Sequence, residues 1–218
     1  MNRQAIEDYL KTIYELAEAE TPVSTTRVAE ARQVKASSAT NMMQKLARLG
    51  LVSYQKHRGV TLTREGQVIA LETIRHHRLV ELYLTQELGF GWDEVHEEAE
   101  LLEHVLSEKL AERMADVLGD PEFDPHGHPI PARDGTLTLP PTRPMSDLEQ
   151  GAVATVSRVN DDSNAELLRY LDDLGIRPGT QFRLLELAPF EGPLTIQVNQ
   201  KQKIVGRRAA DSIYVKTE

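Results

Sequence analysis

The 218-residue sequence predicts a mainly helical fold with additional β structure, divided among two or three compact units. Three observations support this prediction. Apolar residues recur at helical spacing as far as about residue 118, segment 120–144 is crowded with proline and glycine, and short β-rich runs fill the remainder. We expect an N-terminal winged helix-turn-helix at 1–64, a helical domain at 65–140 and a small β-barrel at 148–218.

The N-terminal unit begins with an amphipathic helix, in which Ile6, Leu10 and Ile13 follow helical spacing. A break at Pro22 separates it from two further helices, and Gly50 is a good stop residue for the last one. The three helices are expected at about 4–19, 25–32 and 35–50. The segment LVSYQKHRGVTLT then alternates apolar and polar residues around a central turn, which is typical of a β-hairpin. This order of elements indicates a winged helix-turn-helix.

The third helix carries the side chains expected of a recognition helix, which enters the major groove of DNA. Asn41 and Gln44 are suited to reading base edges, whereas lysine and serine side chains are suited to holding phosphates. The candidate DNA-binding residues on this helix are Lys35, Ser37, Ser38, Thr40, Asn41, Gln44 and Lys45, and those on the hairpin are Lys56, His57 and Arg58. The alternative is a helical bundle whose hairpin contacts another protein.

Charge is distributed unevenly along the chain. The net charge is -9, yet residues 1–64 contain ten Lys and Arg against six Asp and Glu. Residues 87–124 contain thirteen acidic residues and two basic ones. The N-terminal unit is therefore the part suited to approach phosphate, and the acidic stretch is suited to bind a cation.

Helical spacing continues from Thr63 to about Leu88 and, after a GFGW turn, from about Trp92 to Leu118. Within the second of these helices lies the run HEEAELLEH. Its candidate metal ligands have offsets of zero, four, seven and eight, which place them on one face of a helix. They are His96, Glu100, Glu103 and His104, and the preceding helix carries His77 and Glu81 four residues apart.

Two helices with histidine and carboxylate side chains at these spacings indicate a divalent-metal site. The sequence contains no cysteine, so oxygen and imidazole ligands remain, and these suit Mn(2+) or Fe(2+) better than copper(I) or structural zinc. A metal-dependent hydrolase is the catalytic alternative. Against it, Glu100 stands where an inverted zinc-peptidase motif needs histidine, and Leu101 stands three residues before His104, where a ferritin-like motif needs glutamate.

The remaining sequence predicts β structure and a location inside the cell. Beyond about Leu148, the runs GAVATVSRV, TQFRLLEL, PLTIQV and SIYV indicate strands, with one helix near 164–173.

No apolar stretch approaches the roughly 20 residues of a membrane-spanning helix, and the N-terminus does not resemble a signal peptide. We therefore expect a cytoplasmic protein.

Several motifs together resemble the diphtheria toxin repressor family, and more closely its manganese-responsive members. These motifs are EDYLKTIYEL, HHRLVELYL, HEEAELLEH and the strap DPHGHPIP, which together cover about the first 140 residues. The segment RYLDDLGIRPGT resembles the SH3-like domain of longer members, which also occurs in ferrous-transport accessory proteins. The resemblance implies a homodimeric regulator of transcription, not an enzyme, that binds a palindromic operator in double-stranded DNA and represses metal-transport genes.

The resemblance also implies which residues hold metal. It gives a first site of Asp8, Glu100, Glu103 and His104, and a second site of His77, Glu81 and His96. Iron-type members have methionine at the position of Asp8 and cysteine at that of Glu100, so both carboxylates favour manganese over iron.

Two further positions bear on these sites. Short members have glutamate where this chain has Lys11, which implies two separate sites rather than a bridged pair of ions. Longer members supply another ligand to the second site from the C-terminal domain. Glu166 is the candidate here, with Asp161 and Asp162 close by in sequence.

Overall fold

The computed structural model describes residues 3–217 and separates into two units with dense internal contacts. The first unit comprises the chain up to His77, together with Glu103–Leu106 and Pro131–Thr136. The second unit comprises Arg78–Leu102, Ser107–Ile130 and the chain from Leu137 onward. The three-domain division at 1–64, 65–140 and 148–218 stays a prediction.

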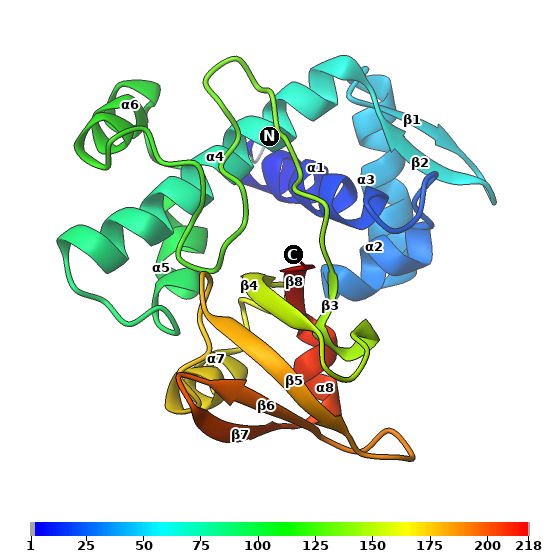
Figure 1. Cartoon of the computed structure of the whole chain (residues 1–218). Coiled ribbons are helices and arrows are strands. Elements are labelled where there is room, and N and C mark those ends of the chain that lie inside the picture. Colours follow the sequence, from blue (N-terminus) through cyan, green and yellow to red (C-terminus); the bar gives the residue numbers. More distant parts are fainter. Residues whose placement is uncertain (1–2, 218) are drawn as a thin grey trace. The chain divides into compact units, whose positions relative to one another are not determined.

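The first unit contains a winged helix-turn-helix, as the sequence predicts (Figure 1). Strands β1 and β2 pair in antiparallel register, with Val52 opposite Leu62 and Gln55 opposite Gly59. The elements are α1 (Arg3–Ala17), α2 (Thr25–Ala31), α3 (Ala36–Arg48), β1 (Val52–Gln55), β2 (Gly59–Leu62) and the first part of α4 (Arg64–Glu87).

Apolar residues from every element of the winged helix-turn-helix meet in one core. Leu10 and Ile13 of α1 are fully buried, as are Met43 and Leu46 of α3. The hairpin packs closely against the segment before α2, and the backbone there leaves no room for a side chain at Gly59. Its φ is +104°, and an added Cβ would lie 2.5 Å from the carbonyl oxygen of Val23.

The helical segment after α4 differs from the prediction of one helix over 92–118. It is divided into α5 (Val95–Leu102) and α6 (Glu108–Val117), with a turn between them. Ser107 begins the second helix, because its side chain accepts a hydrogen bond from the backbone N–H of Leu110. The turn changes the direction of the chain just where two of the candidate metal ligands occur.

The C-terminal part of the second unit is an antiparallel β domain with strand order β3-β8-β4-β5-β6-β7. The sequence runs named above correspond to β4, β5, β6 and β8, whereas β3 and β7 were not predicted. The elements are β3 (Arg143–Pro144), the 3-10 helix η1 (Met145–Asp147), β4 (Val153–Val159), α7 (Ala165–Asp173), β5 (Gln181–Leu187), β6 (Leu194–Val198), β7 (Lys201–Val205), α8 (Arg207–Ser212) and β8 (Ile213–Thr217).

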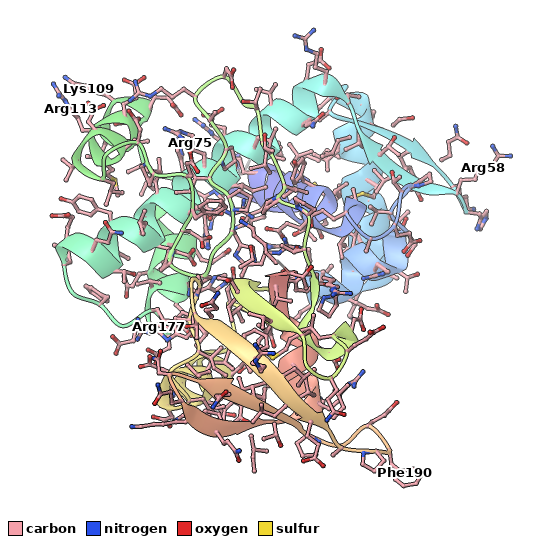
Figure 2. The ribbon with its side chains drawn as sticks, in the orientation of Figure 1. Arg58, Arg75, Lys109, Arg113, Arg177 and Phe190 are labelled. Carbon is pink, nitrogen blue, oxygen red and sulfur yellow. The ribbon has the colours of Figure 1, made fainter. Side chains whose placement is uncertain are left out.

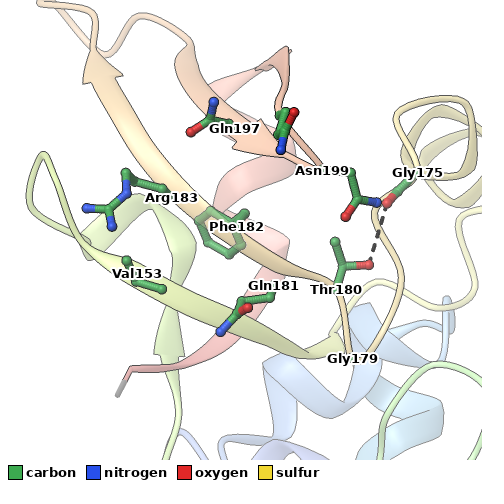
Figure 3. A pocket seen from close by; sticks show the side chains of 10 residues that line it. Val153, Gly175, Gly179, Thr180, Gln181, Phe182, Arg183, Gln197 and Asn199 are labelled. Atoms are coloured by element: carbon green, nitrogen blue, oxygen red, sulfur yellow. Dashed lines mark hydrogen bonds between the residues drawn. The ribbon is translucent and has the colours of Figure 1, made fainter.

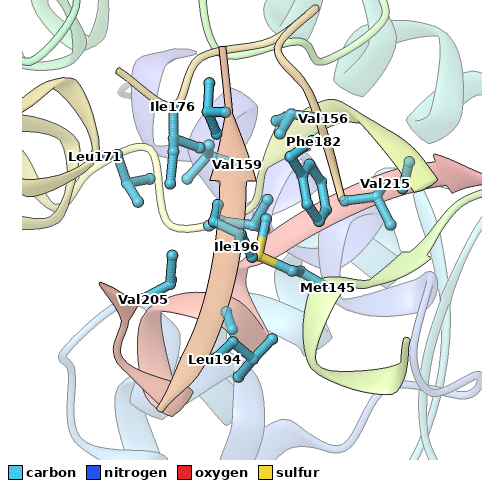
Figure 4. Packing of buried hydrophobic residues seen from close by; sticks show 14 of the residues in the cluster. Met145, Val156, Val159, Leu171, Ile176, Phe182, Leu194, Ile196, Val205 and Val215 are labelled. Carbon is cyan, nitrogen blue, oxygen red and sulfur yellow. The ribbon is translucent and has the colours of Figure 1, made fainter. Parts of the chain in front are cut away.

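Strand residues and helix residues share the core of this β domain (Figure 4). Ile196 and Leu184 come from the sheet and Leu171 from α7, and all three are fully buried. Trp92, from the turn between α4 and α5, is 2% exposed and belongs to the same core.

The predicted fold class is confirmed: winged helix-turn-helix, helical domain and small SH3-like β domain. Among the described residues, none of the helices is long and apolar enough to cross a membrane.

Candidate metal centre and DNA interface

The run HEEAELLEH does not form a single helical face, which corrects the sequence prediction. Helix α5 ends at Leu102, so His96 and Glu100 lie on the helix, whereas Glu103 and His104 lie in the turn that follows. In the first unit, this turn brings Glu103 and His104 to Asp8 of α1. Asp8, Glu103 and His104 therefore lie together as expected, but a turn, and not helical periodicity, brings them together.

These three residues form what we call the first ligand group. One ligand atom from each of Asp8, Glu103 and His104 lies within 4.8 Å of the others. His104 Nε2 is 2.8 Å from Asp8 Oδ1 and 3.3 Å from Glu103 Oε1. Atoms bound to one ion at about 2.0–2.6 Å lie roughly 3–5 Å apart, so these separations fit a single divalent ion.

The first ligand group also contains buried atoms that lack hydrogen bonds. Glu103 Oε1 and His104 Nε2 are both buried and have no hydrogen-bond partner, although they lie close together. An unsatisfied buried polar atom is costly, and a metal ion bound to these lone pairs would remove that cost. The donor set of two carboxylates and one imidazole therefore fits a divalent cation.

Each member of the group is held from behind by another side chain. Arg32 Nη2 donates to Asp8 Oδ2 at 2.7 Å, which leaves Asp8 Oδ1 directed at the group. His104 Nδ1 lies 2.8 Å from Glu7 Oε2, so Nδ1 can donate its proton to Glu7 in the tautomer whose Nε2 lone pair would bind an ion. Such outer contacts orient metal ligands and fix the histidine tautomer.

Glu103 is held on its outer side by two side chains. Lys11 Nζ donates to Glu103 Oε2 at 2.8 Å and lies 3.1 Å from His77 Nδ1. His77 Nδ1 is in turn 2.5 Å from Glu103 Oε2. Lys11 and His77 are both buried, so a fixed positive charge stands beside the first group. The expectation that Lys11 keeps two metal sites separate, rather than bridged, stays a prediction.

A second cluster in the second unit is centred on Glu81 of α4, which is fully buried. Glu81 Oε1 lies 3.3 Å from His96 Nδ1, and Glu81 Oε2 lies 3.5 Å from His126 Nδ1. Candidate ligand atoms lie within 4.8 Å of one another in two sets that share Glu81. One set is Glu81, His96 and Asp162, and the other is Glu81, Asp124 and His126. We call these five residues the second ligand group.

The strap between α6 and β3 supplies two members of the second ligand group. Asp124 Oδ1 accepts hydrogen bonds from the backbone N–H groups of His126 and His128, which folds the strap into a tight turn. His126 Nε2 lies 2.7 Å from the carbonyl oxygen of Trp92, so its Nδ1 is directed at Glu81. The strap also contacts the β domain, because the N–H of Val159 donates to the carbonyl oxygen of His126.

Histidines and carboxylates in the second group perturb one another's protonation. Burial lowers the pKa of His126, but the hydrogen bond and charge of Glu81 outweigh burial and raise that pKa to about 9. Burial raises the pKa of Asp124, but the charge and hydrogen bond of His128, together with the charge of Arg78, outweigh burial and hold the pKa below its ordinary value. His126 therefore holds a proton near neutral pH in the absence of metal, and that proton must leave before Nδ1 can bind an ion.

Two predicted ligands, Glu166 and Glu100, belong to neither ligand group. Glu166 is exposed at the start of α7. Asp162, from the loop before that helix, lies near Glu81 and His96 instead. Glu100 is half-buried on α5 in the second unit. Its assignment to the first site together with Asp8 stays a prediction.

Sequence reasoning did not identify several residues of these groups. Glu7 and Arg32 act through hydrogen bonds to ligands, and the sequence shows Glu7 only as a neighbour of Asp8. Asp124 and His126 lie in a strap that was recognised by resemblance but given no ligands. Their spacing of two residues in a segment bounded by proline was the available signal.

The candidate DNA-binding residues lie on the outer side of the winged helix-turn-helix. Lys35, Ser37, Ser38, Asn41 and Gln44 are exposed on or just before α3. The exposed side chains Lys56, His57 and Arg58 form the hairpin turn, and Figure 2 shows Arg58 extending from it. Thr40 and Lys45 are half-buried, and the hydroxyl of Thr40 donates to the carbonyl oxygen of Ala36. Thr40 is thus less available to DNA than the other residues of this set.

One further cavity, of about 560 Å³, lies on the β domain (Figure 3). It is lined mainly by polar side chains at the ends of β5 and β6, where Thr180 Oγ1 lies 3.5 Å from the carbonyl oxygen of Gly175. None of its lining residues belongs to either ligand group. The cavity is therefore distinct from both candidate metal centres.

Three family descriptions match successive parts of the chain. Residues 2–60 match the iron dependent repressor N-terminal DNA binding domain, and residues 63–132 match the iron dependent repressor metal binding and dimerisation domain. Residues 143–217 match the FeoA domain. These matches agree with the DNA-binding, metal-binding and SH3-like assignments made from the sequence.

Relatives and solved structures agree with these matches. The iron-dependent repressor IdeR of Mycobacterium leprae is 32% identical over 188 residues, which cover 80% of this chain and 81% of that protein. The diphtheria toxin repressor of Corynebacterium diphtheriae is 30% identical over 204 residues, which cover 89% of each. The match to the repressor of Corynebacterium jeikeium covers 60% of that protein.

A solved manganese-dependent transcriptional repressor in complex with manganese superimposes with a TM-score of 0.90 and 40% identity, covering 98% of this chain and 100% of that one. The manganese regulator SloR superimposes with a TM-score of 0.77 and 36% identity, covering 98% of each chain. SloR is described as a regulator and the other proteins as repressors, which agrees with the expectation of a regulator rather than a hydrolase. The chain therefore belongs to the diphtheria toxin repressor family of metal-dependent, DNA-binding transcriptional repressors.

Proposed function

We propose that this chain is a manganese-responsive repressor of metal-transport genes, with Fe(2+) as the alternative ion. The observation that carries this proposal is the first ligand group, in which Asp8, Glu103 and His104 direct three ligand atoms at one point. Asp8 belongs to the same helix, α1, that supplies the core of the DNA-binding unit. Metal at this point would therefore act directly on the part of the protein that binds DNA.

The chemistry of the first ligand group supports the choice of manganese. Two carboxylates and an imidazole are hard ligands, and the sequence contains no thiolate that would favour a softer ion. Glu100 is the proposed fourth ligand. The ion would supply positive charge that draws the carboxylates together, and Lys11, Glu7 and Arg32 keep their outer atoms in place. Two of the similar solved structures are also manganese-dependent repressors by their descriptions.

We propose a second metal site in the second ligand group, separate from the first. The sequence predicts Glu81 and His96 as ligands of this site together with His77. We propose Asp162, in place of Glu166, as the ligand from the C-terminal domain. Asp124 and His126 of the strap supply the alternative ligands around Glu81. An ion at this site would connect α4 and α5 with the strap and with the loop after β4. The second site would thus stabilise the attachment of the β domain.

Regulation would follow from the dimer geometry that helix-turn-helix proteins need. A two-fold dimer must place its two recognition helices about 34 Å apart to meet successive major grooves of a palindromic operator. Metal that fixes α1 against the turn after α5 would favour the spacing that binds DNA. By thermodynamic linkage, DNA would raise metal affinity by the same factor.

Since the protein acts on DNA, we place it in the cytoplasm.

The test is a DNA-binding titration with Mn(2+), Fe(2+), Zn(2+) and Co(2+) in parallel, on wild-type protein and Glu103→Ala. Saturating Mn(2+) should raise the DNA affinity of the wild-type protein by about 5- to 150-fold, as for typical allosteric coupling. Glu103→Ala should lose this response. A chelator should reverse it in the wild-type protein without unfolding the chain, as circular dichroism can check.

Glu98→Ala is the matched control, because Glu98 is an exposed carboxylate of the same segment and belongs to neither ligand group. This variant should respond to metal like the wild-type protein. If DNA binding by the wild-type protein is independent of all four metals, the proposed function is wrong. If Glu103→Ala keeps the full response, the assignment of the first ligand group is wrong.

A further inference from the structure

The side chain of Arg32 connects the helix-turn-helix to the first ligand group. Arg32 Nη2 donates to Asp8 Oδ2 at 2.7 Å, and the two side chains are 30% and 13% exposed. The guanidinium also lies 5.7 Å from the centroid of the Tyr9 ring. Arg32 Nε is buried and has no hydrogen-bond partner. The contacts with Asp8 and Tyr9 therefore fix the position of the guanidinium.

Asp8 uses its two oxygens for different purposes. Asp8 Oδ1 lies 2.8 Å from His104 Nε2 and is the atom that belongs to the ligand group. Asp8 Oδ2 accepts the hydrogen bond from Arg32. The guanidinium thus holds the carboxylate in the orientation that presents one oxygen to an ion. Exposed ion pairs contribute little to stability, so the effect of this partly buried pair lies mainly in its geometry.

Arg32 also occupies a particular place in the helix-turn-helix. It is the residue that ends α2, and its backbone N–H donates to the carbonyl oxygen of Val28. Helix α3 begins at Ala36, after a turn in which Gln33 has a φ of +51°. A restraint on the side chain of Arg32 is therefore a restraint on the turn that leads into the recognition helix.

We propose that Arg32 is a positioning residue that couples metal at Asp8 to the placement of α3. This inference rests on the proposed function. An ion on Asp8 Oδ1 fixes the carboxylate, the carboxylate fixes Arg32 through Oδ2, and Arg32 fixes the end of α2. The recognition helix then occupies one position against α1 rather than several. Without the guanidinium, metal can still bind, but metal binding has a smaller effect on the position of the recognition helix.

The coupling is measured by one ratio, the DNA affinity at saturating Mn(2+) divided by the DNA affinity in chelator. A typical value for an allosteric protein is about 5- to 150-fold. In Arg32→Gln, which removes the charge and the forked donor, we expect this ratio to fall about fivefold or more. Arg32→Lys keeps the charge but loses the fork, and it should give an intermediate ratio.

A second readout does not depend on detecting DNA binding. The electron paramagnetic resonance signal of free Mn(2+) reports manganese affinity with and without operator DNA. Linkage requires that DNA raise manganese affinity by the same ratio. We expect Arg32→Gln to reduce this effect of DNA as well. If both ratios in Arg32→Gln equal those of the wild-type protein, the proposal is overturned.

A direct contact between Arg32 and a DNA phosphate would give a different result. Loss of such a contact lowers DNA affinity equally with and without metal and leaves the ratio unchanged, which would overturn the proposal. Arg27→Gln is the matched control, because Arg27 lies on the same helix, is exposed and pairs with Glu20 rather than with a ligand. It should keep the wild-type ratio.

The dependence on Asp8 is tested in a double-mutant cycle. In Asp8→Asn the ratio should already be low, and adding Arg32→Gln should lower it no further. A further drop would contradict a pathway through Asp8. If Arg32→Gln does not fold, as judged by circular dichroism, Arg32→Lys decides the question by the same ratio. A wild-type ratio of one would instead refute the proposed function itself, so the two failures are distinguishable.

Discussion

At the scale of single residues, the first ligand group resembles a set of ligands held ready for an ion. Asp8, Glu103 and His104 each present one atom inward, and each has its other atom held by a neighbouring side chain. Glu7 and Lys11 perform this holding from α1 itself. Such outer contacts restrict the orientation of metal ligands and so reduce the ordering that metal binding requires.

Glu7→Gln tests this arrangement without removing a ligand. Glutamine keeps the shape but accepts a weaker hydrogen bond from His104 Nδ1, so the imidazole is less basic and less firmly oriented. We expect manganese affinity at the first site to fall about 10- to 100-fold, as for outer partners of metal ligands elsewhere. Isothermal titration calorimetry on the chain without DNA measures it.

The control for this prediction is Glu18→Gln, which removes the same charge at the exposed end of the α1 region. It should leave manganese affinity within a few-fold of wild type. Equal affinities for Glu7→Gln and the wild-type protein would show that Glu7 has no part in orienting His104.

At the scale of elements, the strap is the connection between the second ligand group and the β domain. Gly127 allows it to lie against β4, because an added Cβ would stand 2.0 Å from the carbonyl oxygen of Ser157. Its φ of +88° also favours glycine. The hydrogen bond from Val159 N–H to the carbonyl oxygen of His126 depends on this close approach.

Gly127→Ala should therefore displace the strap and with it Asp124 and His126. We expect the variant to lose the second manganese ion while the first ligand group, which contains no strap residue, keeps its ion. Metal stoichiometry by calorimetry would fall from two to about one per chain.

Gly135→Ala is the matched control for backbone strain. Gly135 has a similar φ of +79°, but an added Cβ there would meet no atom within 4 Å. It should keep both ions. A Gly127→Ala variant that still binds two ions would contradict the role given to the strap.

These elements also show what the sequence could and could not reveal. Helices α1, α2 and α3 and the hairpin follow from local patterns of apolar residues and turn signals. The break after Leu102 was missed, because apolar Val105 and Leu106 continue the helical spacing through the turn. Periodicity reports which residues face a core, and it does not report a turn that preserves the same spacing.

Long-range contacts were harder still to foresee. Asp162 comes from the loop before α7, whereas Asp124 and His126 come from the strap, and their meeting at Glu81 depends on how the strap lies against β4. Spacing indicates Glu103 and His104 as ligands, but only the resemblance adds Asp8, since Asp8 and His104 are 96 residues apart and no local pattern connects them. The resemblance implies a ligand from the C-terminal domain and makes Glu166 the candidate, yet that position is exposed.

At the scale of the whole molecule, the charge distribution separates the two binding tasks. The chain carries a net charge of -9, but residues 1–64 have an excess of basic side chains and residues 87–124 an excess of acidic ones. A divalent cation at the proposed first site would reduce the negative charge around Asp8 and Glu103, which lie in the same unit as the recognition helix. In this proposal, metal would favour DNA binding by geometry and by reduced repulsion of phosphate.

We expect the first ligand group, rather than the second, to govern DNA binding. The most direct test is the manganese dependence of operator binding by His104→Gln and His96→Gln, followed by fluorescence anisotropy. We predict that His104→Gln stays at the affinity of the metal-free protein, whereas His96→Gln reaches wild-type affinity at saturating manganese. A full manganese response in His104→Gln, with loss of that response in His96→Gln, would instead show that the second ligand group governs DNA binding.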